Sequence, residues 1–177
     1  VAQSIYDEIV DFANYAFNKA HAVCYAVVSY QTAYLKCHYP RQYMAALMTS
    51  VLDSAVKISG YIAECKDMGI RVLPPDINHS DDHFTVEGDA IRFGLGAVKT
   101  VGQGAVNAII RERQNSPFKD IFDFCSRIDT TECNKRVVES LIKAGAFDHT
   151  GANRAQLLAV FESAMDATIS RRKANVD

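Results

Sequence analysis

The sequence predicts a mainly α-helical (α+β) protein with a helical N-terminal segment, a short β-hairpin connector and a second helical domain. Apolar residues recur at helical spacing before residue 70 and again after residue 93. Between these parts, residues 71–93 contain a proline pair and alternating apolar and polar residues. The 177 residues are 49% apolar and 23% charged, which excludes collagen-like, mucin-like and intrinsically disordered proteins.

We expect four helices in the N-terminal segment, with the ranges 5–17, 21–38, 41–52 and 55–68. Ser4 precedes the first helix as a candidate cap, and the early turns of that helix carry acids that suit a helix N-terminus. Pro40 ends the second helix and opens the third, because proline lacks the amide hydrogen that a helix interior needs. Either Asp53 or Ser54 can cap the fourth helix, which Gly69 is suited to end.

A small β-element is expected next. The run 70–78 is of β type, but Pro74-Pro75 limits it to a short or edge strand. The run 84–93 alternates around Glu87-Gly88-Asp89, which is typical of a hairpin. The expected organisation is a helical segment over residues 1–70, the β connector 71–93, the second helical domain 94–167 and a flexible tail 168–177.

Charge is distributed unevenly, although the formal net charge is only −2. Residues 1–93 carry seven Lys or Arg against eleven Asp or Glu, whereas residues 94–147 carry eight against six. Residues 12–52 contain no carboxylate but hold six of the eight tyrosines, together with Lys, Arg and His. Cations and flat rings in one segment favour contact with nucleotides or nucleic acid. The alternative is a buried helical hairpin whose tyrosines belong to the core.

The segment GLGAVKTVGQGAVNAIIRER has the pattern of a helix-hairpin-helix. Apolar residues at helical spacing lie on both sides of the tight turn Gly102-Gln103-Gly104. Glycines let a phosphate approach the backbone, where amide groups and the N-terminus of the next helix attract an anion. The nearby cations are Lys99, Arg111 and Arg113. We predict that this turn and Lys99 bind the DNA backbone without reading its sequence; the alternative is a helical turn that only packs the core.

A looser second copy follows. The run SPFKDIFDFCSRI predicts a short helix, and Asn134 is suited to cap the next one. The apolar face of that next helix is Val137, Val138, Leu141 and Ile142. Its turn lacks glycine, so Lys135 and Arg136 are the candidate phosphate contacts, unless this copy is only a structural mate of the first. A last amphipathic helix is expected over 153–166.

Several kinds of chemistry are absent from the sequence. It contains no P-loop, G-x-S-x-G or HExxH motif, no run of 18 apolar residues and no signal peptide pattern. Its five cysteines form no CxxC pair and are expected to be free thiols in a reducing compartment. The His79-x3-His83 pair lacks further ligands, and the pairs Asp7-Glu8 and Asp81-Asp82 do not suit a two-metal clamp. We therefore predict no metal site and no catalytic residue in this chain.

The chain resembles the alpha subunits of bacterial replicative DNA polymerase III, the C-family polymerases. The segment FNKAHAVCYAVVSYQTAYLKCHYPRQYMAALMTS is similar to part of their fingers. The further matching segments, in the family's order, are ECKDMGIRVLPPDIN, IRFGLGAVKTVGQGAVNAII, PFKDIFDFC, NKRVVESLIKAGAFD and NRAQLLA. The resemblance implies the C-terminal part of the fingers, a β connector and a tandem helix-hairpin-helix domain that binds duplex DNA.

The same resemblance implies roles and partners. Asn18, Lys19 and His21 match the motif that faces the incoming nucleotide, where a His ring near the sugar would exclude a 2′-hydroxyl. Ala20 stands where the family most often has serine, so this chain lacks that hydroxyl. The parent protein would be a cytoplasmic replisome enzyme that uses Mg²⁺, primer–template DNA and dNTPs. Its palm carboxylates would precede Val1, and its clamp-binding region would follow Asp177.

The alternative function is a stand-alone, non-enzymatic helix-hairpin-helix adaptor that binds DNA. The segment NKAHAVCYA distinguishes the two, because an adaptor has no use for a nucleotide-facing fingers motif. The chain also begins with Val1 rather than Met, so we expect it to be a piece of a longer polymerase.

Overall fold

The computed structural model describes residues 1–15 and 19–174. The chain divides into two compact units, Val1–Pro40 and Arg41–Asp177. Asn18, one of the predicted nucleotide contacts, lies outside the described residues.

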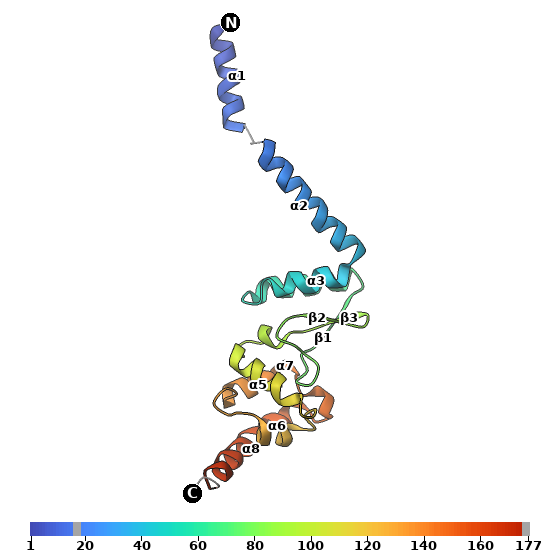
Figure 1. Cartoon of the computed structure of the whole chain (residues 1–177), viewed down its shortest axis with the longest axis vertical. Helices are drawn as coiled ribbons and strands as arrows, with labels where there is room; N and C mark the ends of the chain where they lie inside the picture. Colours follow the sequence, from blue (N-terminus) through green and yellow to red (C-terminus); the bar gives the residue numbers. More distant parts are fainter. Residues whose placement is uncertain (16–18, 175–177) are drawn as a thin grey trace. The chain divides into compact units, whose positions relative to one another are not determined.

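The first unit contains the helices α1 (Ala2–Tyr15) and α2 (Lys19–His38), labelled in Figure 1. The prediction that Ser4 caps α1 is wrong, because the amide of Ile5 already donates to the carbonyl oxygen of Val1 at 3.1 Å. The helix therefore begins earlier than predicted. No described side chain of α2 is buried, and Tyr30 is 70% exposed. The tyrosines of α2 thus do not form a core in this unit.

The second unit begins within helix α3 (Pro40–Thr49), at Arg41, and α3 is followed by α4 (Ala55–Asp67). Pro40 is the first residue of α3, as predicted. Of the two candidate caps of α4, Ser54 is the actual one, since its hydroxyl oxygen accepts from the amide of Lys57 at 3.5 Å. Gly69 follows α4 with a φ of +73°, a left-handed conformation that glycine adopts without strain.

A three-stranded sheet follows, made of β1 (Arg71–Leu73), β2 (Thr85–Glu87) and β3 (Ala90–Arg92). Its strand order is β1-β3-β2, with β1 parallel and β2 antiparallel to β3. The predicted hairpin and the predicted edge strand are both present. The buried side chain of Ile91 packs in one cluster with Met44, Met48 and Ile58. The sheet and the α3–α4 pair therefore share a core.

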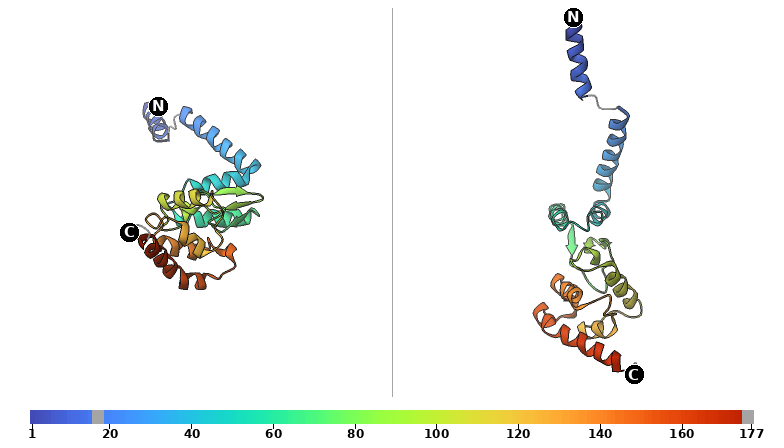
Figure 2. Two further views of the ribbon diagram at one scale, coloured as in Figure 1. Left: turned by 60° about the horizontal axis from the view of Figure 1, so that its bottom comes forward. Right: turned by 90° about the vertical axis from the view of Figure 1, so that its left-hand side faces the viewer.

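The rest of the second unit is helical. Its elements are η1 (Leu95–Ala97), α5 (Gln103–Arg113), α6 (Ile121–Arg127), α7 (Lys135–Ala144), η2 (Asp148–Thr150) and α8 (Arg154–Ala174). Figures 1 and 2 show the sheet between the α3–α4 pair and helices α5–α8. These elements surround the larger core cluster.

Helix α8 is longer than the sequence predicted, because it continues from Arg154 to Ala174 through most of the expected tail 168–177. Its end is attached to the end of α6. The guanidinium of Arg172 donates to the carbonyl oxygens of Ser126 at 2.9 Å and Ile128 at 3.1 Å. These contacts satisfy carbonyl groups that the end of a helix leaves without partners.

Apolar side chains of both hairpins belong to the larger core cluster. The predicted apolar face of α7 is buried at all four positions, Val137, Val138, Leu141 and Ile142. Phe118, Phe124 and Phe147 make edge-to-face contacts with centroid distances of 4.9 and 5.1 Å. Burial raises the pKa of the Cys125 and Cys133 thiols to about 12, so both stay protonated and pack as small apolar groups.

A pair of identical substitutions tests this core. Val138→Ala removes two methyl groups from a fully buried site, and we expect it to lower the free energy of unfolding by about 1.5–3 kcal/mol. Val56→Ala on α4 removes the same atoms from a side chain that is 85% exposed, so its effect should stay within about 0.5 kcal/mol. Urea unfolding of both variants measures the difference. Equal losses would contradict the assigned core.

Candidate nucleic-acid interface

The first hairpin joins η1 to α5. The amides of Val98 and Val101 donate to the carbonyl oxygens of Leu95 and Val98, each at 3.1 Å, and both valines are buried. Thr100 between them has a φ of +73°, which is unusual for a β-branched residue and costs on the order of 1–2 kcal/mol. Its hydroxyl lies 2.6 Å from that of Ser140 on α7. The hairpin backbone is therefore held in a strained conformation just before its glycines.

The N-terminus of α5 lacks a side-chain cap. Gly102 is its cap residue and supplies no hydrogen-bonding side chain. The neighbouring helices all have such a group: α6 is capped by Asp120, α7 by Asn134, and α8 by Asn153, whose side chain accepts from the Gln156 amide at 2.9 Å. Among helices α4 to α8, all within the described residues, only α5 therefore has first amide groups that donate to no capping side chain.

The two glycines of this hairpin have different surroundings. Gly102 has φ −87° and ψ 166°, values open to any residue, and a Cβ built there would meet nothing within 4 Å. A Cβ at Gly104 would collide with the Glu132 carboxylate from the second hairpin. The fold itself therefore does not require glycine at 102, and the small residue leaves open space in front of the helix.

The side chains predicted to contact phosphate differ in whether they already interact with other residues of the chain. Lys99 is exposed at the hairpin, and Gln103 donates to the Asn107 side chain at 3.2 Å. Lys135 instead forms ion pairs with Asp166 at 2.8 Å and Glu162 at 3.7 Å. The hydrogen bond to Asp166 raises the pKa of Lys135. Arg136 is exposed, so it is the freer of the two candidates on α7.

Arg113 was expected to supply charge for DNA, but the structure gives it an internal position. Its side chain is only 14% exposed and pairs with Asp81 at 2.7 Å. It also donates to the carbonyl oxygens of Ile77 and Ser80. These bonds use its donors inside the fold, so Arg113 holds the loop after β1 instead of facing a ligand. Arg111 remains exposed.

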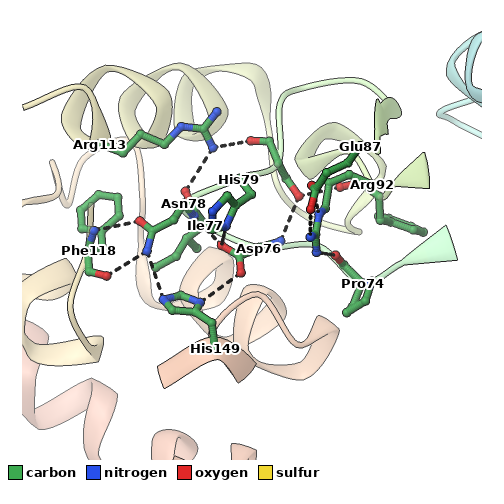
Figure 3. A network of polar contacts seen from close by, with 12 residues as sticks. Pro74, Asp76, Ile77, Asn78, His79, Glu87, Arg92, Arg113, Phe118 and His149 are labelled. Carbon is green, nitrogen blue, oxygen red and sulfur yellow. Dashed lines mark hydrogen bonds and ion pairs between the residues drawn. The ribbon is translucent and has the colours of Figure 1, made fainter. Parts of the chain in front are cut away.

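That loop carries a polar network, which Figure 3 shows around Asp76. The Asp76 carboxylate lies between two rings, 3.2 Å from Nδ1 of His79 and 3.2 Å from Nδ1 of His149. Asn78 exchanges two hydrogen bonds with the backbone of Phe118, at 2.8 and 2.9 Å. The network joins the loop to the segments before α6 and after α7. Within the described residues, no group of three or more His, Cys, Asp or Glu could hold a metal ion.

Two of the predicted nucleotide contacts lie at the start of α2. Lys19 is its first residue, and the ring of His21 lies 4.4 Å from that of Tyr25, measured between centroids. Both side chains are exposed. Their role in nucleotide binding stays a prediction.

Sequence reasoning missed two features of the first hairpin. The strained Thr100 has no local signal, because threonine does not normally mark a left-handed position. The approach of Glu132 to Gly104 joins residues far apart in the chain, and only the packing of the two hairpins brings them together.

Comparison with known proteins agrees with this geometry. A family model described as a helix-hairpin-helix motif matches residues 69–157. Over 176 residues the chain is 48% identical to the DNA polymerase III subunit alpha of Vibrio cholerae and 46% identical to that of Escherichia coli K12. It is 48% identical over 165 residues to that of Bacillus subtilis. These alignments cover 98, 98 and 93% of this chain, but the chain spans only 15% of each relative. The resemblance read from the motifs is confirmed.

Crossing a bilayer would require a long helix that is apolar throughout. None of the helices in residues 1–15 and 19–174 is both long and apolar enough to cross a membrane.

The ion pair between Glu87 and Arg92 connects β2, β3 and the proline loop. Arg92 donates to both carboxylate oxygens of Glu87, at 2.6 and 2.8 Å, and to the carbonyl oxygen of Pro74 at 2.9 Å (Figure 3). The hydrogen bonds from Arg92 hold the pKa of the Glu87 carboxyl below its usual 4.5. Glu87 therefore stabilises the fold above pH 4.5, and this stabilisation is lost as the pH falls through the lower folded-state pKa.

Glu87→Gln should remove that dependence. At neutral pH we expect a loss of about 0.5–1 kcal/mol in the free energy of unfolding, kept small because the carboxylate is 42% exposed. Below pH 4.5 the difference between variant and wild type should shrink as wild-type Glu87 becomes protonated. Urea unfolding at a series of pH values measures this. A difference that does not change between neutral and acid pH would contradict the assigned role.

Proposed function

Because the chain belongs to the helix-hairpin-helix family, we propose that its first hairpin binds the phosphate backbone of duplex DNA without sequence preference. The observation that carries the proposal is the N-terminus of α5, which has no side-chain cap and begins at the open Gly102. The first amide groups of α5 and the positive end of its dipole suit a phosphate oxygen. Lys99 lies exposed nearby and adds a cation.

The second hairpin contributes less to this grip. Asn134 already accepts from the amides of Arg136 and Val137, at 3.0 and 3.1 Å, so the N-terminus of α7 is partly filled. Lys135 is shared with Asp166 and Glu162. We assign Arg136 as its main phosphate contact and Lys135 as an accessory one.

The longer protein is proposed to be a DNA-directed DNA polymerase catalytic subunit. Its relatives are named DNA polymerase III subunit alpha, and the chain aligns with them over nearly its whole length. The described residues include no metal-binding cluster, so the Mg²⁺ that supports nucleotidyl transfer would be held elsewhere in that protein. This chain would contribute the DNA grip and part of the nucleotide site. Its expected setting is the cytoplasmic replisome, with the sliding clamp bound by other regions.

Gly102→Val tests the phosphate grip. The fold has room for the new side chain, which would occupy the space through which a phosphate reaches α5. We expect the 177-residue chain to lose about tenfold or more in affinity for a duplex oligonucleotide, because hydrogen bonds to a charged group are lost. Fluorescence anisotropy at several salt concentrations measures it, and wild-type affinity should fall steeply with salt.

The matched control is Gly60→Val on α4. A Cβ at Gly60 also meets nothing within 4 Å, but this helix belongs to the other core cluster. Its affinity for DNA should remain that of the wild type. If folded Gly102→Val binds as tightly as Gly60→Val, the hairpin is only a packing unit.

We propose a separate role for Lys19 and His21 at the incoming nucleotide. Both are exposed at the N-terminal end of α2, where the helix dipole and the Lys19 ammonium favour a triphosphate. The His21 ring, beside Tyr25, offers a flat wall against the sugar. Asn18 completes the proposed set.

His21→Ala in the full-length protein should raise ribonucleotide incorporation about tenfold relative to dNTP, because a steric wall at the 2′ position is removed. His38→Ala is the matched control, since this histidine also lies against a tyrosine on α2, 4.2 Å from the Tyr34 ring. Competitive primer extension measures the ratio. An unchanged ratio in His21→Ala would rule out the steric role.

A further inference from the structure

The two hairpins contact each other directly. Cys133 in the second hairpin donates its thiol hydrogen to the carbonyl oxygen of Ala105 at 3.7 Å, and the thiol is fully buried. The preceding Glu132 is exposed, and its carboxylate carbon would lie 3.0 Å from a Cβ on Gly104. A carboxylate of the second hairpin thus stands beside the first turn of α5.

We propose that Glu132 weakens DNA binding by the first hairpin, because its carboxylate competes with phosphate for the N-terminus of α5. This inference rests on the proposed function of that hairpin. An acid beside a helix N-terminus is attracted by the same amide groups and dipole that attract a phosphate. When DNA occupies the site, two negative groups face each other across a few ångströms.

Several other acids of this domain form ion pairs with cations. Glu112 pairs with Arg127 at 3.0 Å, and Glu139 pairs with Lys143 at 2.5 Å. No ion pair joins Glu132 to a cation in the part of the chain that the structure describes. The Glu132 charge is therefore not cancelled by an ion pair and acts on an anion that approaches Gly104.

A built-in competing charge has a consequence for the type of binding. It keeps the affinity for the DNA backbone modest. Because salt screens the repulsion, it also makes the affinity fall less steeply with salt than it would without Glu132. The Glu132 carboxylate also favours those anionic ligands that come close enough to the α5 amides to displace it. If DNA were held only by long-range attraction to surface cations, a carboxylate at this position would not improve the choice of ligand.

Glu132→Gln tests the proposal, because it removes the charge and keeps the shape of the side chain. We expect the 177-residue chain to bind a duplex oligonucleotide about three- to fivefold more tightly at about 50 mM salt. The gain should shrink at about 200 mM salt as the repulsion is screened. Glu132→Ala serves as a second variant and must show the same direction of change.

Glu64→Gln on α4 is the matched control, since it changes the net charge equally but lies on a helix of the other core cluster. If Glu132→Gln binds no more tightly than Glu64→Gln, the proposal is overturned. Thermal unfolding of each variant shows whether the substitution also changes the stability of the fold. A loss of stability alone would not increase the affinity for DNA, so tighter binding cannot be explained by a structural effect.

Gly102→Val in the same assay separates this inference from the proposed function. Weaker binding by Gly102→Val, with no gain from either Glu132 variant, would keep the phosphate grip and remove the competing role of Glu132. Unchanged binding by folded Gly102→Val would instead remove the grip itself, whatever the Glu132 variants do.

Discussion

The loop between β1 and β2 is the constraint on which the second unit depends. Ile77 is fully buried in the core of the α5–α8 half, and its amide donates to the carbonyl oxygen of Ala146 at 3.0 Å. Ser80, also fully buried, accepts from the Asp76 amide at 2.9 Å and donates to the Phe93 carbonyl oxygen at 2.7 Å. These bonds join the sheet to the helical half. They also fix where the chain enters the first hairpin.

The ability of the first hairpin to attract an anion depends on which backbone amide groups have no hydrogen-bond acceptor within the fold. Most helix N-termini of this unit are closed by their own side chains, which removes them as anion sites. Helix α5 begins at a glycine instead, so no capping side chain accepts from its first amide groups. In the mode of DNA binding proposed above, the Glu132 carboxylate beside Gly104 and a DNA phosphate compete for the same end of α5.

The sequence predicted most of the secondary structure and some of the site. The predicted features that were confirmed depend on residues within one or two turns. They are the cap Asn134, the cap Ser54 (one of two candidates with Asp53), the start of α3 at Pro40 and the buried face of α7. Such neighbours are visible in the sequence itself. The prediction of Ser4 as a cap failed because Ser4 lies inside α1, whose first helical hydrogen bond runs from the Ile5 amide to the Val1 carbonyl oxygen. The extended end of α8 was missed because its support, Arg172, reaches carbonyl groups on α6.

The sequence by itself therefore determined the helices, the hairpin strands, the glycine turn and the family. Only the tertiary structure decided which charges can meet a ligand. Arg113 forms an ion pair with Asp81, and Lys135 forms ion pairs with two acids of α8. The packing of the two hairpins places Glu132 beside Gly104. Helix periodicity and capping act over three or four residues, whereas these contacts join residues about thirty apart. Their positions depend on how the helices pack, and no local pattern encodes that packing.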